Sequence, residues 1–230
     1  MKTLSFHDFW AGRGSRRLVH ADTAADGAEL KPGLTLIVAP NGYGKSTLLQ
    51  TLAGVLKPLS GQIRLGDEAF QTREQGLYVP EYLAFPKMVY PREWMEFVAG
   101  SLPPEAEWAK WVKALRLEKV MNSYLGRMSQ GERRKVTWLA AHVATHPVVL
   151  MDEPLDGLDV LALEGAREML QDWERRGRIT VVVAHQTAEL TPVAQAAYLI
   201  HDEKLVAVDR PKGKAPTEEN LRAHVRKLYF

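Results

Sequence analysis

The chain has 230 residues, of which 46% are apolar, and this is enough to bury one substantial core. Its 30 basic and 28 acidic residues leave a formal net charge of +2, so we expect no nucleic-acid partner. The absence of cysteine excludes disulfides and thiolate metal sites. Residues 1–17 lack an apolar signal segment, and no later stretch has the roughly 18 apolar residues of a membrane span. We therefore expect a cytoplasmic chain that meets a membrane only through a partner.

Predicted strands and helices alternate along the chain. Three short apolar runs rich in β-branched residues, Leu34–Val38, Val148–Met151 and Ile179–Ala184, predict strands buried on both faces of a parallel sheet. Helical spacing lies between them, and Gly177 supplies a C-terminal cap for the helix that joins the last two strands. This alternation is typical of an α/β layered domain.

Residues 82–145 show helical patterns and no buried-strand run, so we predict a helical insertion within one domain that spans residues 1–230. The tail, residues 209–230, is basic and amphipathic, and we expect a terminal helix docked on its own domain, with a partner or membrane surface as the alternative. His142 and His146 are expected on the solvated end of a helix. Five aromatic residues form either a partner surface or the core of the insertion, and both remain open: Tyr82, Phe85, Tyr90, Trp94 and Phe97.

The stretch APNGYGKST, residues 39–47, follows the first predicted strand directly. A strand, a glycine-rich turn, a lysine, a hydroxyl residue and a helix together form a device for holding polyphosphate on backbone N–H groups. Lys45 would reach the β- and γ-phosphates of a nucleotide, and Ser46 would bind Mg²⁺. Ala39 replaces the usual first glycine, which is tolerable if its φ stays below zero. We expect the Tyr43 ring to point outward.

Two acidic residues follow the second predicted strand. Asp152 and Glu153 stand at its carboxyl end, where ligands bind in open α/β sheets. Asp152 is placed to hold Mg²⁺ together with Ser46, and Glu153 to orient or deprotonate an attacking water. Further upstream, Ser129 and Glu132 have the spacing of a capping box at the start of a helix that Pro147 stops. The sequence therefore predicts a nucleotide-hydrolysing site and an exposed helix N-terminus.

Five motifs resemble those of the ATP-binding-cassette (ABC) ATPases, in chain order an A-loop aromatic residue, the Q-loop, the signature, the D-loop and the H-loop. Residues 128–132, MSQGE, resemble the signature motif, with Gln130 and Glu132 replacing its usual Gly and Gln. Residues 78–81, YVPE, resemble the Q-loop with Glu81 in place of Gln, and residues 155–159, LDGLD, resemble the D-loop. His185 matches the switch histidine of the H-loop. The resemblance implies a P-loop ABC-type α/β fold with a mostly parallel sheet, an N-terminal antiparallel β portion and an inserted helical subdomain.

The resemblance also implies a site shared by two chains, which close head to tail around ATP and Mg²⁺. Trp10, or else Phe9, is the aromatic residue expected to stack on adenine. His185 would steady the γ-phosphate and the water, and Asp159 would communicate between the two copies. The complete expected set is as follows: nucleotide-binding Trp10, Asn41, Gly42, Gly44, Lys45, Ser46 and Thr47; catalytic Glu153, His185 and Glu81; metal-binding Ser46, Asp152 and Glu81; signature residues acting in trans Ser129, Gly131 and Glu132; and Asp159 of the D-loop.

Separate transmembrane subunits are the expected partners, because the chain itself has no predicted span. We predict the ATP-hydrolysing subunit of an ABC transporter, peripheral on the inner face of the membrane. The alternative is a non-transport ABC ATPase, either a regulator of envelope machinery or a DNA-repair type. The repair type places a long coiled coil between the two halves of the site, but Lys45 and Asp152 are only 107 positions apart and no sustained heptads intervene. Its compact middle region and short tail resemble cassettes of export systems, and we expect export.

Overall fold

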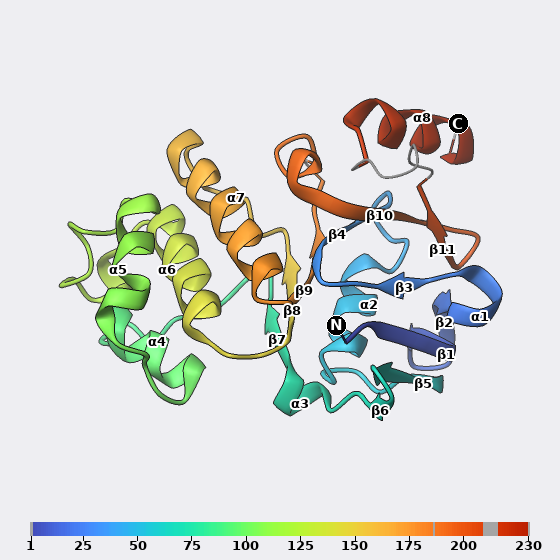
Figure 1. The fold of residues 1–230 in the computed structure, drawn as a ribbon, viewed down its shortest axis with the longest axis horizontal. Helices are drawn as coiled ribbons and strands as arrows, with labels where there is room; N and C mark the ends of the chain where they lie inside the picture. The colour runs from blue at the N-terminus through green and yellow to red at the C-terminus, as the bar shows by residue number, and fades with distance from the viewer. Residues whose placement is uncertain (1, 186, 209–215, 230) are drawn as a thin grey trace.

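The computed structural model describes residues 2–185, 187–208 and 216–229, and it contains one large mixed sheet with helices on both faces (Figure 1). The strands run in the order β6-β5-β1-β2-β11-β10-β4-β9-β8-β7, and β3 pairs with β1. They are β1 (Leu4–Arg13), β2 (Arg16–Ala21), β3 (Glu29–Leu30), β4 (Gly33–Val38), β5 (Ser60–Leu65), β6 (Glu68–Ala69), β7 (Gly76–Val79), β8 (Val148–Asp152), β9 (Ile179–Val183), β10 (Ala194–His201) and β11 (Lys204–Ala207).

The centre of the sheet is parallel and its N-terminal part is antiparallel. Strands β10, β4, β9, β8 and β7 pair in parallel, whereas β1 pairs antiparallel with β2, β3 and β5. The α-helices are α1 (Thr23–Asp26), α2 (Lys45–Leu52), α3 (Thr72–Gln75), α4 (Pro91–Ala99), α5 (Glu105–Ala114), α6 (Gln130–Val143), α7 (Val160–Arg175) and α8 (Glu218–Tyr229), and two short 3₁₀ turns are η1 (Leu125–Arg127) and η2 (Thr191–Val193). The expected α/β fold is confirmed.

The central strands are buried on both faces, as their unbroken apolar runs predict. In β8, Val148 and Leu150 belong to the cluster that contains the apolar residues of α2, whereas Val149 and Met151 belong to the cluster that contains those of α6 and α7. Successive side chains of a strand point to opposite faces, so one strand supports both layers. This arrangement fixes the carboxyl ends of β4, β8 and β9 relative to α2.

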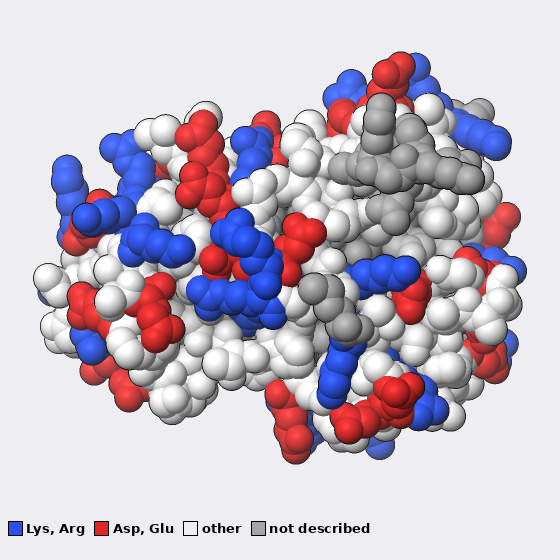
Figure 2. Space-filling view, in the orientation of Figure 1, with Lys and Arg blue, Asp and Glu red and all other residues white. Residues whose placement is uncertain are grey.

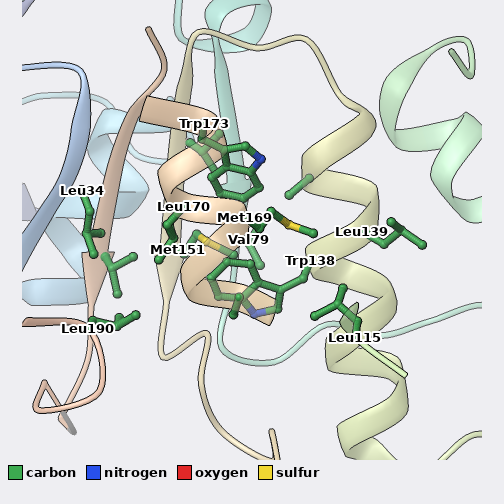
Figure 3. Packing of buried hydrophobic residues seen from close by; sticks show 14 of the residues in the cluster. Leu34, Val79, Leu115, Trp138, Leu139, Met151, Met169, Leu170, Trp173 and Leu190 are labelled. Atoms are coloured by element: carbon green, nitrogen blue, oxygen red, sulfur yellow. The ribbon is translucent and has the colours of Figure 1, made fainter. Parts of the chain in front are cut away.

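Between β7 and β8, residues 82–145 form α4, α5, η1 and α6 and contribute no strand to the sheet. These helices lie to one side of the sheet in Figure 1. Trp138 of α6 and Trp173 of α7 stack at 5.7 Å between ring centroids in the core between them (Figure 3). The Trp138 indole N–H donates to the Pro154 carbonyl at 2.9 Å, so the large ring is buried with its polar atom satisfied.

The aromatic residues after Glu81 divide between core and surface. Phe85 and Trp94 lie 5.2 Å apart between ring centroids and pack against the core cluster of α6 and α7. Tyr82 and Phe97 are 79% and 78% exposed. The core interpretation therefore holds for Phe85 and Trp94, whereas the partner-surface interpretation of the exposed residues stays a prediction.

The helix end at Arg176 confirms the expected glycine cap. Gly177 has φ +74°, its N–H donates to the Glu174 carbonyl at 2.8 Å, and the Arg178 N–H donates to the Trp173 carbonyl at 2.9 Å. This is the Schellman arrangement, which requires a left-handed residue at that point.

His142 corrects an expectation, because it is 3% exposed and not solvated. The Trp173 indole N–H donates to its Nδ1 at 3.0 Å, and the Trp111 ring lies 4.9 Å away. Burial, followed by the neighbouring Arg176 charge, lowers the pKa of His142 to about 3. A helical spacing of two histidines does not show which one faces the core, and α7 covers this one.

The tail forms α8, and its Leu221, Val225 and Leu228 belong to or pack against the core cluster of α6 and α7, which is the expected docking on its own domain. Residues 209–215 and 230 of the predicted tail lie outside the described residues. Within the part of the chain that the structure describes, no helix is both long and apolar enough to span a bilayer. Acidic and basic side chains are interspersed across the face in Figure 2.

Candidate functional site

A cavity of about 350 Å³ opens at the carboxyl ends of β4, β8 and β9, beside the start of α2. We call it the loop cavity. It brings together the phosphate-loop residues and the acidic pair, which lie more than 100 positions apart in the sequence. Its lining residues are Arg13, Arg16, Leu18, Asn41, Gly42, Gly44, Lys45, Ser46, Thr47, Glu81, Asp152, Glu153 and His185.

In the loop from Ala39 to Gly44, glycines occupy the positions with positive φ, as expected. Gly42 and Gly44 have φ +85° and +96°, a region that side chains disfavour, whereas Ala39 is absent from the residues with positive φ. A Cβ at Gly44 would lie 3.0 Å from side-chain atoms of Leu18 and Val19, so glycine is required there on two grounds. Tyr43 is 41% exposed, and its ring meets the Tyr229 ring edge-on at 5.3 Å.

Lys45 lies across the loop that precedes it. Its Nζ donates to the Ala39 carbonyl at 2.7 Å and to the Pro40 carbonyl at 3.2 Å. Burial lowers the pKa of Lys45, and the charges of Glu153 and Asp152 act in the opposite direction. The ammonium group is therefore held at the cavity wall by two carbonyls, under the influence of two carboxylate charges, and it is positioned to meet an anion.

Glu153 adopts a strained backbone at the end of β8. Its φ is +45°, in the left-handed region that costs a non-glycine residue about 1–3 kcal/mol. The Glu153 N–H donates to the Val183 carbonyl at 2.8 Å, and the His185 backbone N–H donates to Glu153 Oε2 at 3.0 Å. These two bonds attach the acid to β9 and aim its side chain at the cavity. Such strain is found where the surrounding structure fixes a functional side chain.

The second carboxylate oxygen of this acid is buried and accepts no hydrogen bond from the described residues. The His185 ring lies beside it, with Nε2 3.4 Å from Glu153 Oε1. Burial raises the pKa of Glu153, whereas the hydrogen bond from the His185 N–H and the charge of the His185 ring lower it. A buried carboxylate with one unused oxygen and a raised pKa has the properties of a general base.

Asp152, Ser46 and Glu81 all line the loop cavity, and their side chains offer only oxygen ligands. Burial raises the pKa of Asp152, and a hydrogen bond with the Ser46 side chain opposes the rise. Among the described residues, no cluster of three or more His, Asp or Glu side chains could hold a metal alone. The donor set fits Mg²⁺, which takes few protein ligands and fills its shell with phosphate oxygens and water.

The signature segment lies outside the loop cavity. Ser129 caps α6 as predicted: the Glu132 N–H donates to Ser129 Oγ at 3.2 Å, and the Ser129 N–H donates to Glu132 Oε2 at 2.7 Å. None of the described residues 128–132 lines the loop cavity. Gly131 lies so close to the Gly157 carbonyl that a Cβ would clash with it. The carboxylate of Glu132 is thus used within its own helix, and the start of α6 lies outside the loop cavity.

Asp159 has partners within the chain. It caps α7, with Oδ1 accepting from the Ala162 N–H at 2.9 Å, and Oδ2 accepts from the Lys135 ammonium of α6. The Lys135 hydrogen bond, followed by that of Ala162, lowers the pKa of Asp159. The residue therefore joins the signature helix to the helix after the D-loop.

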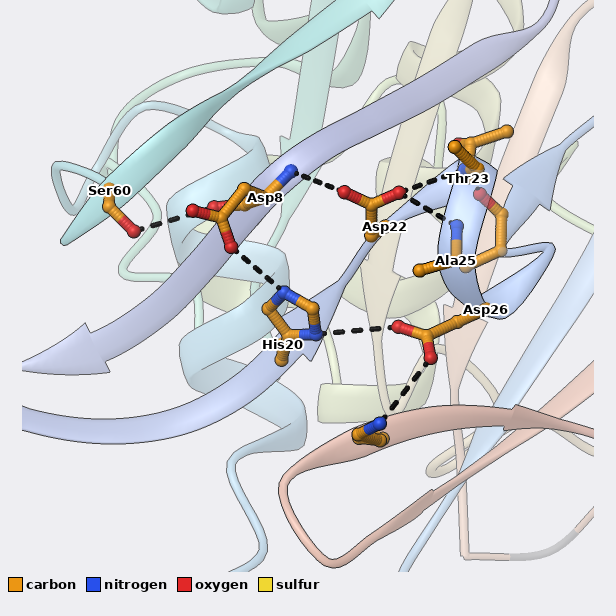
Figure 4. A network of polar contacts seen from close by, with 10 residues as sticks. Asp8, His20, Asp22, Thr23, Ala25, Asp26 and Ser60 are labelled. Atoms are coloured by element: carbon orange, nitrogen blue, oxygen red, sulfur yellow. Dashed lines mark hydrogen bonds and ion pairs between the residues drawn. The ribbon is translucent and has the colours of Figure 1, made fainter.

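The structure does not bring Trp10 to the loop cavity. Its ring packs on His20 at 4.7 Å between centroids and beneath the Arg17 guanidinium at 4.6 Å. His20 is itself held between Asp8, at 3.2 Å, and Asp26, at 3.3 Å (Figure 4). The register of β1 shifts between Ala11 and Gly12, so residues after this bulge no longer follow the alternation that leads up to it.

Arg13, Arg16 and Leu18 line the cavity in its place, and the sequence analysis did not single them out. Arg13 Nε donates to Thr47 Oγ1 at 3.2 Å, which places the guanidinium against the first turn of α2. Arg134 is a further omission, since it is 7% exposed and its guanidinium donates to the Pro80 and Glu81 carbonyls, holding the backbone at Glu81. No motif marks these arginines, and only the fold brings them to the site.

Comparison with known proteins agrees with this geometry. The family model described as "ABC transporter" matches residues 29–156, more than half of the chain. The chain belongs to the ABC transporter family. This ABC ATPase is 34% identical over 196 residues to a probable sulfate/thiosulfate import ATP-binding protein CysA of Chlorella vulgaris, covering 78% of this chain and 81% of that protein. It is 28% identical to the molybdenum import ATP-binding protein ModC of Mycobacterium tuberculosis, covering 75% of this chain and 52% of ModC.

A solved structure described as the ATP binding subunit of an ABC transporter superposes with a TM-score of 0.78 at 20% identity, over 99% of this chain and 95% of that one. This likeness supports the fold. The ABC ATPase spans only about half the length of ModC. Both named relatives are import proteins, so the comparisons do not support the expected export direction.

Proposed function

We propose that this ABC ATPase hydrolyses ATP in the loop cavity, at a site completed by a second copy, and powers transport through separate transmembrane subunits. The observation that carries the proposal is the convergence of Lys45, Asp152 and Glu153 on one cavity while the capped start of α6 lies outside it. One chain thus supplies a phosphate loop and an acidic pair, and it offers an unused helix N-terminus to another chain.

The phosphate loop would hold the polyphosphate. The backbone N–H groups around Gly42 and Gly44 and the N-terminus of α2 attract the anion, and Asn41, Ser46 and Thr47 line the same cavity. Lys45 would exchange its two loop carbonyls for the β- and γ-phosphates. Burial lowers the pKa of Lys45, and the charge of an adjacent phosphate would act in the opposite direction by favouring the ammonium form.

Mg²⁺, when bound, would neutralise charge on the β- and γ-phosphates. Ser46 and Asp152 would hold it, and Glu81 would add a carboxylate from the cavity wall. Glu81 stands where the resembling motif has Gln, so it would bring extra negative charge to the site. Arg134 fixes the backbone of Glu81 and supplies a nearby positive charge, which offsets part of that charge.

Glu153 would act as the general base. Water attacks the γ-phosphorus, the bond from that phosphorus to the oxygen bridging the β- and γ-phosphates breaks, and ADP and phosphate are released. The proton lost by the water passes to Glu153, whose Oε1 is unused while Oε2 is fixed by the His185 N–H. The His185 ring, 54% exposed beside Oε1, would steady the γ-phosphate and the water.

The second copy would place Ser129 and Gly131 against the γ-phosphate across the interface. A capped helix start attracts anions through its N–H groups and dipole, and in one chain this end has no phosphate to meet. Glu132 would act from within the capping box, by fixing the first turn of α6. Asp159 would transmit the position of α7 to the signature helix through Lys135.

Separate membrane subunits would dock near the exposed aromatic residues Tyr82 and Phe97, which would place the ABC ATPase on the inner face of a membrane. Affinity purification from native membranes in mild detergent tests this part. We expect a stoichiometric partner with several membrane spans, whereas recovery of soluble partners alone would contradict it.

Complementation tests the shared site. Lys45→Ala and Ser129→Arg should each abolish hydrolysis, because each variant damages both sites of its own dimer. Mixing the two should restore activity, since the mixed dimer has one site with both changes and one site with neither. A mixture as inactive as its components would contradict the shared site.

A further inference from the structure

Helix α8 contacts the phosphate loop from outside the loop cavity. None of the described residues 216–229 lines that cavity, yet the Tyr229 ring meets the Tyr43 ring edge-on, at 5.3 Å between centroids and an interplanar angle of 89°. An edge-to-face pair of this kind is favourable beyond the apolar area that it buries. The proposed function uses neither ring.

Tyr43 is the one side chain between two glycines of the loop. Gly42 and Gly44 have φ +85° and +96°, and glycine loses more backbone freedom on folding than any other residue. A Cβ at Gly42 would meet nothing within 4 Å, so the space beside this glycine is open. A contact that fixes Tyr43 therefore limits the conformations of the backbone N–H groups on both sides of it.

Tyr229 is itself fixed at the end of β10, against which α8 packs (Figure 1). Its hydroxyl donates to the Ile200 carbonyl, and its ring meets the His201 ring edge-on at 5.5 Å between centroids. Burial raises the pKa of Tyr229 to about 12, so the hydroxyl keeps its donor proton near neutral pH. Because Leu199 of β10 pairs with Val38 of β4, the end of β10 lies beside the point where the phosphate loop begins.

The first turn of α8 is attached to the domain by separate contacts. Glu218 Oε2 accepts from the Thr187 hydroxyl at 3.3 Å, and the Thr191 hydroxyl lies 3.2 Å from the same oxygen. Leu221 is 2% exposed and belongs to the core cluster of α6 and α7. Tyr229 is therefore presented to the loop by a helix that is docked at its other end.

We propose that Tyr229 is a positioning residue for nucleotide binding: its ring holds Tyr43 and so keeps the phosphate loop in the conformation that receives the phosphates of ATP. This proposal rests on the proposed function, in which the loop binds ATP. A loop that is ordered before binding gives up less conformational freedom when the ligand arrives, and the affinity is higher for that reason. Lys45 would leave its two loop carbonyls when nucleotide binds, whereas the contact between the two rings would remain. A partner that displaced α8 would therefore lower ATP affinity without entering the loop cavity.

A double-mutant cycle on Tyr43 and Tyr229, with affinity for a fluorescent ATP analogue as the readout, tests the proposal. Tyr229→Ala should weaken binding about 2- to 10-fold, the fold-change that corresponds to the energy of an aromatic pair. In the Tyr43→Ala background, Tyr229→Ala should cause no further loss, because the partner ring is already absent. In a hydrolysis assay Tyr229→Ala should raise the KM for ATP and leave kcat unchanged, since the loop holds the phosphates equally before and during the reaction.

Tyr229→Phe and Leu228→Ala are the matched controls. Tyr229→Phe keeps the ring that meets Tyr43 and removes only the hydroxyl, so its affinity should match that of the wild type. Leu228→Ala shortens the neighbouring side chain of α8, which packs against the core cluster, and it should also bind the analogue like the wild type. If Tyr229→Ala fails to fold, Tyr229→Leu decides the outcome by the same titration, because it keeps apolar volume and removes the ring.

Lys45→Ala distinguishes a failure of this proposal from a failure of the proposed function. If Lys45→Ala loses nucleotide affinity while Tyr229→Ala matches the wild type, the positioning role is wrong and the proposed function stands. If Lys45→Ala binds the analogue like the wild type, the loop is not the nucleotide site, and the positioning role falls with it. Losses that add in the double variant, or an equal loss in Tyr229→Phe or Leu228→Ala, would also overturn the proposal, because the contact between the two rings would then not be the cause.

Discussion

Acid should destabilise the fold through His142, by an amount that follows from its burial. Burial lowers the pKa of His142 from 6.5 to about 3, so the folded state excludes a proton that the unfolded state accepts. The stability attributable to the neutral ring is complete above pH 6.5 and is lost as the pH falls towards 3. At pH 5 the loss relative to pH 8 is about 2 kcal/mol, and below pH 3 it reaches about 5 kcal/mol.

Urea unfolding at pH 8 and pH 5, for wild type and His142→Gln, measures the contribution of His142 to the free energy of unfolding. Gln keeps an acceptor for the Trp173 indole N–H but does not titrate. The variant should be less stable than the wild type at pH 8, because it loses the ring packed between Trp111 and Trp173. Its loss of stability between pH 8 and pH 5 should be about 2 kcal/mol smaller than that of the wild type. Parallel pH dependences in the two proteins would refute the reasoning, since all other groups titrate in both.

Three further outcomes follow from the site. Gly44→Ala should weaken ATP binding more than Gly42→Ala does in a fluorescent-nucleotide titration. The reason is that a Cβ at Gly44 meets Leu18 and Val19 at 3.0 Å, whereas one at Gly42 meets nothing within 4 Å. Equal losses of affinity would contradict the packing argument. Lys45→Ala should weaken nucleotide binding itself, and unchanged affinity would show that the ammonium does not meet phosphate. The rate of hydrolysis should fall as the pH decreases, with a midpoint above the ordinary pKa of a glutamate side chain. Burial raises the pKa of Glu153, and only its carboxylate form can accept a proton. A rate that is constant through this pH range would exclude Glu153 as the titrating base.

Local patterns predicted the elements that local chemistry determines. The strands at Leu34, Val148 and Ile179, the capping box at Ser129 and the glycine cap at Gly177 all formed as expected, because each depends on residues a few positions apart. The negative φ required of Ala39 is also present. These features needed no knowledge of how distant segments pack.

The remaining features depend on contacts between distant segments. His142 is buried because α7 covers α6, and the helical spacing of histidines carries no information about that cover. Arg13 reaches the loop cavity because β1 shifts register at Ala11, a bulge that composition does not reveal. Sequence reasoning located the chemistry but not the residues that orient it.

The measurement that tests the central claim most directly combines hydrolysis and oligomeric state in Glu153→Gln. This change keeps the shape of the side chain and removes the base, so the account predicts normal ATP binding, nearly complete loss of turnover and accumulation of an ATP-bound dimer by light scattering. Lys45→Ala in the same background should prevent the dimer from forming, because nucleotide no longer joins the two copies. Unchanged hydrolysis in Glu153→Gln, or a monomer with ATP bound and uncleaved, would contradict the account.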